Sequence, residues 1–167
     1  MKSRRNVLRN ILSGLGTLSA ALAGMHGLLS GSAAHAARTH ELMHSDEEWK
    51  KLLPPDAYRV LRKAGTERPH SSPLNREKRA GVYSCAGCAL PLFSSSTKFE
   101  SGTGWPSFWQ PLENAVVEET DTTLFIRRTE VLCRRCGGHL GHVFKDGPKP
   151  TGLRYCMNGV ALAFKAA

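Results

Sequence analysis

The sequence predicts a mainly β domain with short helices at its N-terminal end. Helix-start patterns are confined to residues 46–63, where a capping sequence and a proline pair occur. From residue 81 onward, short apolar runs alternate with turn residues, which is typical of strands. Strands and long helical segments do not alternate, so the pattern excludes a parallel sheet with crossover helices.

Two helices are expected in residues 46–63. Ser45 and Glu48 have the spacing of a capping box, which predicts a helix from Asp46 to about Leu53. Its buried side should consist of three apolar residues: Trp49, Leu52 and Leu53. Pro55 suits the first turn of a second helix that continues to about Lys63, with Gly65 as the expected stop.

Short strands are expected over most of the remaining chain. Asp121 is interpreted as a hairpin turn between two of these strands, and the apolar residues 124–126 should be largely covered. The expected strands are 81–84, 115–119, 123–131, 142–144, 153–156 and 160–164.

Residues 1–36 have the three-part layout of an export signal. They contain four basic and no acidic residues, then an apolar run over 11–29, then Ala34-His35-Ala36 as a cleavage sequence. Ser3 to Arg9 resembles the twin-arginine export motif, with Val7 where that motif has Phe. We therefore expect export to the periplasm with cleavage after Ala36, and membrane contact during export alone. A retained membrane anchor is the alternative, because the run is near spanning length.

The rest of the chain has the length of one domain. Residues 37–42 are expected to form a flexible lead-in and residues 43–167 the domain itself. The whole chain has 167 residues, 41% of them hydrophobic, and a net charge of +9, which falls to +5 when the four basic residues of the export signal are removed. This modest charge forms no long basic run, so a nucleic-acid partner is not expected.

The five cysteines divide into two C-x-x-C pairs and one single residue. Two such pairs have the spacing of a four-thiolate site for one structural zinc ion, with each pair forming a tight knuckle. The expected ligands are Cys85, Cys88, Cys133 and Cys136. The 44 residues between the pairs indicate that the metal would join distant parts of the domain.

Three alternatives to this zinc site stay open at the sequence level. Each C-x-x-C pair could form a disulfide. Either pair could be a thioredoxin-like redox centre, although no βαβ pattern surrounds them. Zinc could instead be bound by four residues of the second region, leaving Cys85 and Cys88 as a disulfide: Cys133, Cys136, His139 and His142.

Cys156 is the cysteine without a partner. If residues 152–159 form a strand, Arg154, Cys156 and Asn158 share one face. A thiol beside a guanidinium suits a nucleophile, because a nearby cation lowers its pKa. The alternative is a buried cysteine that acts as a small apolar residue.

Two further segments contain candidate pocket residues. His139 and His142 lie among glycines, where an imidazole could donate a proton in a pocket, form structural hydrogen bonds or bind metal. Trp105 lies in a glycine-rich turn before a proline and could form the apolar wall of a ligand site, although a tryptophan is more often part of the core.

Several ordered motifs together resemble the B-type peptide methionine sulfoxide reductases. The resemblance covers about residues 43–164 and is carried chiefly by residues 58–62, 65–69, 102–108, 138–144 and 152–156. It implies two antiparallel sheets, a four-cysteine zinc site and reduction of the R epimer of methionine sulfoxide, protein-bound or free. The roles that it implies are nucleophile for Cys156, binding and protonation of the oxygen for His139, His142 and Asn158, support of the thiolate for Arg154, and binding of the substrate methyl group for Trp105.

The sequence departs from the family pattern at two positions. Thr103 stands where many members have a second, resolving cysteine, so the resemblance implies regeneration by an external thioredoxin-like protein or small thiol. Gly159 stands where serine is common.

Two rival functions are a zinc-ribbon binding module, which would need a basic stripe with interleaved aromatic residues, and a thiol oxidoreductase that uses the C-x-x-C pairs.

Overall fold

The computed structural model describes residues 40–123 and 127–167. The expected export signal, residues 37–39 of the lead-in and the apolar residues 124–126 lie outside these ranges. Within the described ranges, no helix is long and apolar enough to cross a membrane.

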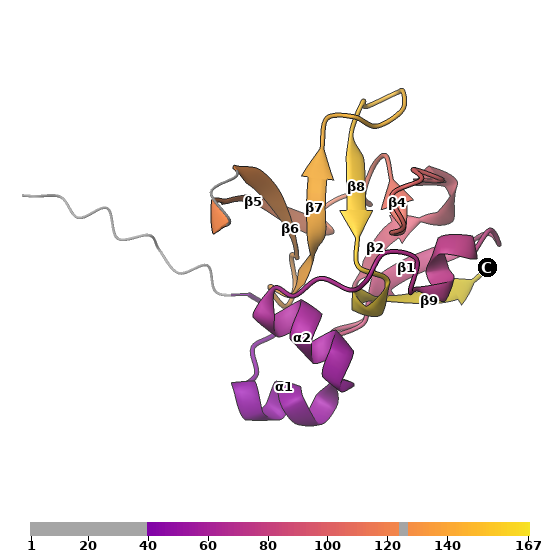
Figure 1. The fold of residues 1–167 in the computed structure, drawn as a ribbon. Coiled ribbons are helices and arrows are strands. Elements are labelled where there is room, and N and C mark those ends of the chain that lie inside the picture. The colour runs from indigo at the N-terminus through magenta and orange to yellow at the C-terminus, as the bar shows by residue number, and fades with distance from the viewer. Residues whose placement is uncertain (1–39, 124–126) are drawn as a thin grey trace, which may run out of the picture. The chain divides into compact units, whose positions relative to one another are not determined.

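The fold consists of two antiparallel sheets, as the resemblance implies (Figure 1). The larger sheet has the order β3-β4-β8-β7-β6-β5. Its strands are β3 (Lys98–Phe99), β4 (Ser107–Phe108), β5 (Val116–Asp121), β6 (Arg128–Cys133), β7 (His139–Phe144) and β8 (Arg154–Met157). The smaller sheet has the order β2-β1-β9, from β1 (Gly81–Cys85), β2 (Pro91–Ser94) and β9 (Leu162–Ala166). Short 3-10 helices lie between these elements: η1 (Pro73–Arg76), η2 (Ser95–Thr97) and η4 (Gly159–Ala161).

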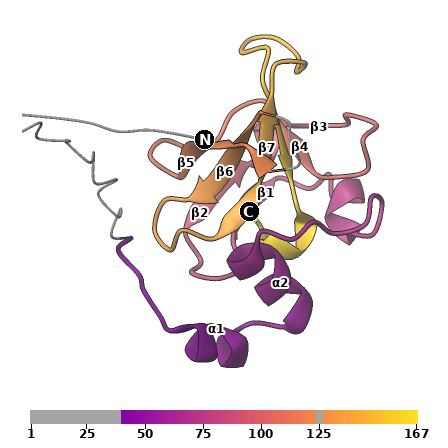
Figure 2. The same cartoon turned by 60° about the vertical axis from the view of Figure 1, so that its left-hand side comes forward.

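Two α-helices precede the sheets, where the sequence predicts them. In α1 (Asp46–Leu52) the Ser45 hydroxyl accepts the backbone N–H of Glu48, and the Glu48 carboxylate accepts the N–H of Ser45, so the capping box is complete. The second helix, α2 (Pro55–Lys63), starts with the expected proline. It lies between α1 and the strands in both views (Figures 1 and 2).

Two expectations about the helices are wrong. Leu52 is 60% exposed, because the seven-residue α1 turns it away from α2 while Trp49 and Leu53 are buried. The left-handed residue that ends α2 is Ala64, with φ of 50°, one position before the predicted glycine.

The strand boundaries also differ from the prediction in places. Asp121 is the last residue of β5 and pairs with Arg128 of β6, rather than forming the turn itself. The expected strand 160–164 is divided, because η4 takes up residues 159–161 before β9 begins. Strands β2, β3 and β4 were not predicted.

An aromatic cluster joins the two sheets. Phe93 of β2 stacks on Phe108 of β4 with ring centroids 4.4 Å apart, and Tyr83 of β1 contacts Phe108 edge-on at 4.9 Å. All three side chains are fully buried. Burial of such a side chain contributes roughly 1.5–3 kcal/mol. The cluster therefore holds β4, the neighbour of β8, against strands β1 and β2 of the smaller sheet.

Residues 40–42 contact the turn after β6, although the sequence predicts a flexible lead-in there. The backbone N–H of Leu42 donates to the carbonyl of Arg135 at 2.9 Å, and Nδ1 of His40 lies 3.1 Å from the carbonyl of Arg134. Glu41 forms an ion pair with Arg134. This part of the lead-in is held against the loop that contains Cys133 and Cys136.

Candidate active site and metal centre

Strand register places Cys156 between two other polar side chains. Cys156 of β8 lies opposite His142 of β7 and opposite Ser107 of β4. Directly opposite residues of antiparallel strands share a face, with Cβ atoms about 4.5–5.5 Å apart. The β7–β8 register requires Gly141, because a Cβ there would lie 2.1 Å from the carbonyl oxygen of Cys156. The sheet alone therefore brings a thiol and an imidazole together.

A β-bulge brings the second histidine to the same region. Residues three apart on a regular strand face opposite sides of the sheet. The pairing of β6 with β7 shifts by one residue at Leu140, since Val131 pairs with Gly141 and Leu132 with His139. An extra residue restores the same side for His139 and His142, whose ring centroids are 5.4 Å apart.

Cys156 lines a pocket of about 160 Å³ together with three other predicted site residues: Trp105, His142 and Asn158. The remaining lining residues were not predicted: Thr66, Arg128, Gly141 and Phe144. His139 lines a neighbouring pocket of about 340 Å³, which His142 also borders. The structure thus brings four of the six predicted catalytic and substrate residues to one pocket and places His139 beside it.

Arg154 lies on β8, two residues before Cys156, but its guanidinium binds another partner. Two of its nitrogens donate to the carboxylate of Asp146, each at 2.8 Å, and the group lies over the ring of Phe144. Arg154 therefore interacts with both Asp146 and Cys156, and it still lowers the pKa of the thiol.

Burial raises the pKa of the Cys156 thiol. Three neighbours act in the opposite direction: the hydroxyl of Thr103, the charge of Arg154 and the hydroxyl of Ser107. Burial is the largest effect, so the thiol of the free protein is largely protonated at neutral pH.

This balance predicts the pH dependence of Cys156 alkylation. The thiolate is the reactive form, so the iodoacetamide rate should rise with pH and reach half its maximum above the pKa of about 8.5 of an unperturbed cysteine. Arg154→Met should move the midpoint to still higher pH, because a charge that lowers the pKa is lost. Mass-spectrometric rates for Cys156 between pH 6 and pH 10 provide the measurement. A wild-type midpoint near neutrality would show that Arg154 outweighs burial.

Each histidine is oriented by a carboxylate that the sequence did not identify. Nε2 of His142 lies 2.9 Å from Oδ2 of Asp121. Hydrogen bonds from Thr123 and His142 and the guanidinium of Arg128 hold the pKa of Asp121 well below its usual range. Asp121 is thus an ionised acceptor, and Nε2 of His142 carries the hydrogen. Burial lowers the pKa of His142, so the ring is neutral at neutral pH.

His139 is 4% exposed, and its Nδ1 lies 2.6 Å from Oε1 of Glu130. Its Nε2 is buried without a hydrogen-bond partner among the described residues. Buried polar atoms are nearly always satisfied, so this nitrogen is available to a ligand or a water molecule. Glu130 lies on β6 directly opposite His142, a placement that depends on the pairing of β6 with β7 and that the sequence does not signal.

The side chain of Ser72 explains why position 159 is a glycine in this chain, where serine is common in the family. A Cβ at position 159 would lie 2.0 Å from Oγ of Ser72 and 2.4 Å from its Cβ. The Ser72 side chain is buried. In this chain Ser72 therefore fills the space into which a side chain at position 159 would project.

The four paired cysteines form two knuckles of matching geometry. In the first, the N–H of Ala89 donates to the carbonyl of Cys85, and in the second that of Gly137 donates to Cys133, both at 2.8 Å. The donor residue follows the second cysteine in each case and has a positive φ, 57° for Ala89 and 66° for Gly137. These tight turns direct both thiols of a pair to the same side.

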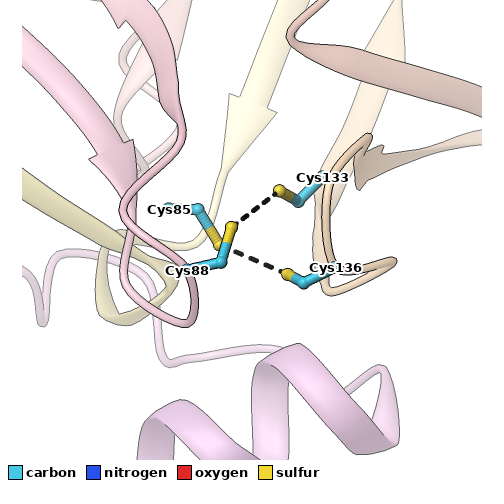
Figure 3. A group of neighbouring side chains, drawn as sticks. All are labelled: Cys85, Cys88, Cys133 and Cys136. Atoms are coloured by element: carbon cyan, nitrogen blue, oxygen red, sulfur yellow. Dashed lines mark hydrogen bonds between the residues drawn. The ribbon is translucent and has the colours of Figure 1, made fainter. Parts of the chain in front are cut away.

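The two knuckles face each other (Figure 3). Cys88 and Cys133 are 3.5 Å apart at sulfur, Cys85 and Cys136 are 3.7 Å apart, and all four sulfurs lie within 4.8 Å of one another. Four thiolates at about 2.3 Å from a tetrahedral zinc ion would be separated by about 3.8 Å, so the cluster fits a metal ion. None of the five cysteines, all within the described ranges, is in a disulfide, and neither histidine belongs to the cluster, which argues against the alternatives.

The cluster connects the two sheets. Cys85 ends β1 of the smaller sheet and Cys133 ends β6 of the larger one. Helix α2 covers the second knuckle, where Arg62 donates to the carbonyl of Cys136 at 2.9 Å. The predicted link between distant parts of the domain is therefore present.

Comparison with known proteins agrees with this geometry. A family model described as the SelR domain matches residues 53–166. The chain is 60% identical over 122 residues to the peptide methionine sulfoxide reductase MsrB of Methanosarcina barkeri, covering 72% of this chain and 86% of that protein. It is 54% identical over 127 residues to the protein of the same name from Leptospira interrogans, covering 75% and 97%. The chain belongs to the MsrB family.

Membership of the MsrB family confirms the resemblance and makes the chain an oxidoreductase. The mainly β fold with two antiparallel sheets and clustered cysteines is confirmed as well. The roles of individual residues stay predictions. Asp121, Glu130 and Glu67 were not identified as site residues from the sequence; the last lies in the segment 65–69 that helped to carry the resemblance.

Proposed function

We propose that the chain reduces the R epimer of methionine sulfoxide, protein-bound or free, with Cys156 as the nucleophile. The observation that supports this most is the position of Cys156, outside the four-cysteine cluster and in a pocket with Trp105, His142 and Asn158. The names of the relatives support the substrate class.

In the proposed reaction the Cys156 thiolate attacks the sulfoxide sulfur. The attack joins Sγ of Cys156 to the sulfoxide sulfur, and the oxygen takes up a proton. Transfer of this oxygen to Sγ breaks both the sulfur–oxygen bond and the new sulfur–sulfur bond, which releases methionine and leaves a sulfenic acid on the protein. The proton lost by the thiol balances the proton gained by the oxygen, so the step needs no other reactant. His142 is suited to transfer this proton, because its ring is neutral and lies opposite Cys156.

The other pocket residues have roles in binding. Trp105 offers an apolar wall to the methyl group, and its Nε1 donates to the carbonyl of Glu67 at 3.2 Å, which orients the indole. Asn158 donates one hydrogen of Nδ2 to the carbonyl of Leu140, and the other is available to the sulfoxide oxygen. His139 supports His142 from the neighbouring pocket, and Arg154 partly offsets the effect of burial on the Cys156 pKa.

The metal at the cysteine cluster is proposed to be one zinc ion per chain with a structural role. Four thiolates occupy all four positions of a tetrahedral ion, so no position is left for substrate. The cluster takes no part in the reaction; it stabilises the junction of the two sheets.

An assay with the two separate sulfoxide epimers tests the proposal. With dithiothreitol as reductant, the protein should convert methionine-R-sulfoxide and leave the S epimer unchanged, in free methionine or in a short peptide. Equal conversion of both epimers, or of neither, would contradict the proposed specificity.

The sulfenic acid is proposed to be reduced by an external thiol, through a mixed disulfide. The Oγ1 atom of Thr103 lies 3.8 Å from Sγ of Cys156, at the position where a resolving sulfur would be needed, but it cannot form a disulfide. The four other cysteines belong to the metal cluster. The proposed reductant is a thioredoxin-like protein or a small thiol.

Thr103→Cys should create the missing internal partner. The two side chains are already in contact, so a short closure of the turn reaches disulfide geometry. After one equivalent of sulfoxide we expect a disulfide between the introduced thiol and Cys156 in place of the sulfenic acid, detected by mass spectrometry of the unreduced protein. Thr120→Cys, at an exposed position on β5, is the control and should keep a dimedone-reactive Cys156. A persistent sulfenic acid in the Thr103 variant would show that the turn is too rigid to close.

Export by the twin-arginine route, with residence in the periplasm and cleavage after Ala36, is part of the proposal. Its support is the sequence of residues 1–36. Arg4→Lys together with Arg5→Lys should leave the precursor in the cytoplasm, because this route depends on the arginine pair. Cell fractionation and the mass of the product provide the measurement. An unchanged periplasmic yield would favour another route.

A further inference from the structure

Glu67 is a buried residue next to the Cys156 pocket, in contact with two of the residues that line it. It lies in the connection between α2 and η1 and is 5% exposed. In sequence it is far from Trp105 and Asn158, yet it forms hydrogen bonds with both. The reaction described above uses only its backbone carbonyl, which orients the indole of Trp105, and gives its carboxylate no role.

The backbone of Glu67 fixes the orientation of both pocket residues. Its carbonyl accepts the indole N–H of Trp105, and its N–H donates to Oδ1 of Asn158 at 2.9 Å. Because a backbone N–H needs an acceptor, the Asn158 amide cannot reverse without losing this bond. Nδ2 is therefore kept at the other end of the amide, where it donates to Leu140.

The carboxylate of Glu67 holds the backbone that follows Asn158. Oε1 accepts the N–H of Gly159 at 2.6 Å, and Oε2 accepts the N–H of Val160 at 3.0 Å. These two amides begin η4, and the side chain of its N-cap residue, Asn158, forms no capping hydrogen bond. The first N–H groups of a helix lack partners within it, and a carboxylate forms strong bonds with them. Glu67 thus replaces the missing cap.

We propose that Glu67 is a positioning residue for the sulfoxide reduction, which holds Asn158 and Trp105 in their places around Cys156. The inference rests on the proposed function of this pocket. Glu67 need not touch the substrate; it acts through the two residues that do. A displacement of about 1 Å in such residues can lower a rate about 100-fold.

Glu67→Gln tests the carboxylate at nearly constant size. The amide replaces one acceptor oxygen with an NH2 group, which would face the N–H of residue 159 or 160, while the backbone contacts of residue 67 remain. In a single turnover with methionine-R-sulfoxide and no reductant, we expect the rate constant to fall about 10- to 100-fold. The amplitude should stay at about one methionine per protein. Glu113→Gln, at an exposed glutamate, is the matched control and should leave both values unchanged.

The rate constant and the amplitude separate positioning from stability. A merely structural role would lower the amplitude, which counts folded protein, and leave the rate constant of the folded fraction unchanged. That result, or a rate constant within about twofold of wild type, would overturn the inference. If the glutamine variant does not fold, Glu67→Asp, which keeps the charge but is one methylene shorter, is judged by the same criterion. A wild-type protein that releases no methionine would instead refute the proposed function.

Discussion

Cys156→Ser is expected to lower kcat/KM for methionine-R-sulfoxide by at least about 10³-fold. The serine hydroxyl is close in size to the thiol but does not ionise near neutral pH, so the attacking thiolate is lost. The pocket should otherwise be preserved, because Cys156 is held by pairing of β8 with β7 and β4 rather than by its sulfur. Steady-state assays with dithiothreitol, on protein of known metal content, give the ratio.

The metal content distinguishes this loss from unfolding. Cys156→Ser should keep one metal ion per chain and the thermal unfolding midpoint of the wild type, whereas Cys88→Ser, the same substitution in the cluster, should lose metal. Substantial turnover by the Cys156 variant would contradict its assignment as the nucleophile. Loss of metal from that variant would mean that the two groups of cysteines are not independent.

Cys136→Ser is expected to release the metal and lower the free energy of unfolding by on the order of 5 kcal/mol or more. Binding of a structural metal is also folding free energy, and here the cluster joins the end of β1 to the end of β6. Since whole domains are stable by about 5–15 kcal/mol, much of the variant should be unfolded at room temperature.

Urea unfolding of the metal-loaded wild type and the Cys136 variant, with metal analysis of the same samples, measures this effect. Ser84→Ala, one residue before Cys85 and outside the cluster, is the matched control and should keep its metal. A metal-free wild type that is fully stable, with its paired cysteines oxidised to disulfides, would contradict the proposed zinc site.

Local patterns were the part of the structure that could be predicted from the sequence. The Ser45–Glu48 spacing specifies both hydrogen bonds of a helix start, and Pro55 suits only a first turn, so both helix starts were predicted correctly. The C-x-x-C pairs specify tight turns that direct two thiols to one side, and the cluster follows when two such turns meet. Cys156 stood out as the cysteine without a partner, and the resemblance to the family, rather than the pairing itself, implied its role as nucleophile.

Features that depend on long-range pairing could not be predicted in this way. The exposure of Leu52 depends on how α1 lies against α2, and a seven-residue helix gives too few positions to define its inner face. The shared side of His139 and His142 depends on the bulge at Leu140, which spacing on a regular strand does not indicate. The binding of Arg154 by Asp146 depends on the turn between β7 and β8.

The products of a single turnover test the central claim most directly. One equivalent of methionine-R-sulfoxide, added without reductant, should yield one methionine and a sulfenic acid on Cys156, identified by dimedone labelling and mass spectrometry. The four cluster cysteines should remain reduced and bound to metal. A disulfide between Cys156 and any of these four cysteines, or the absence of released methionine, would contradict a reaction carried by Cys156 alone.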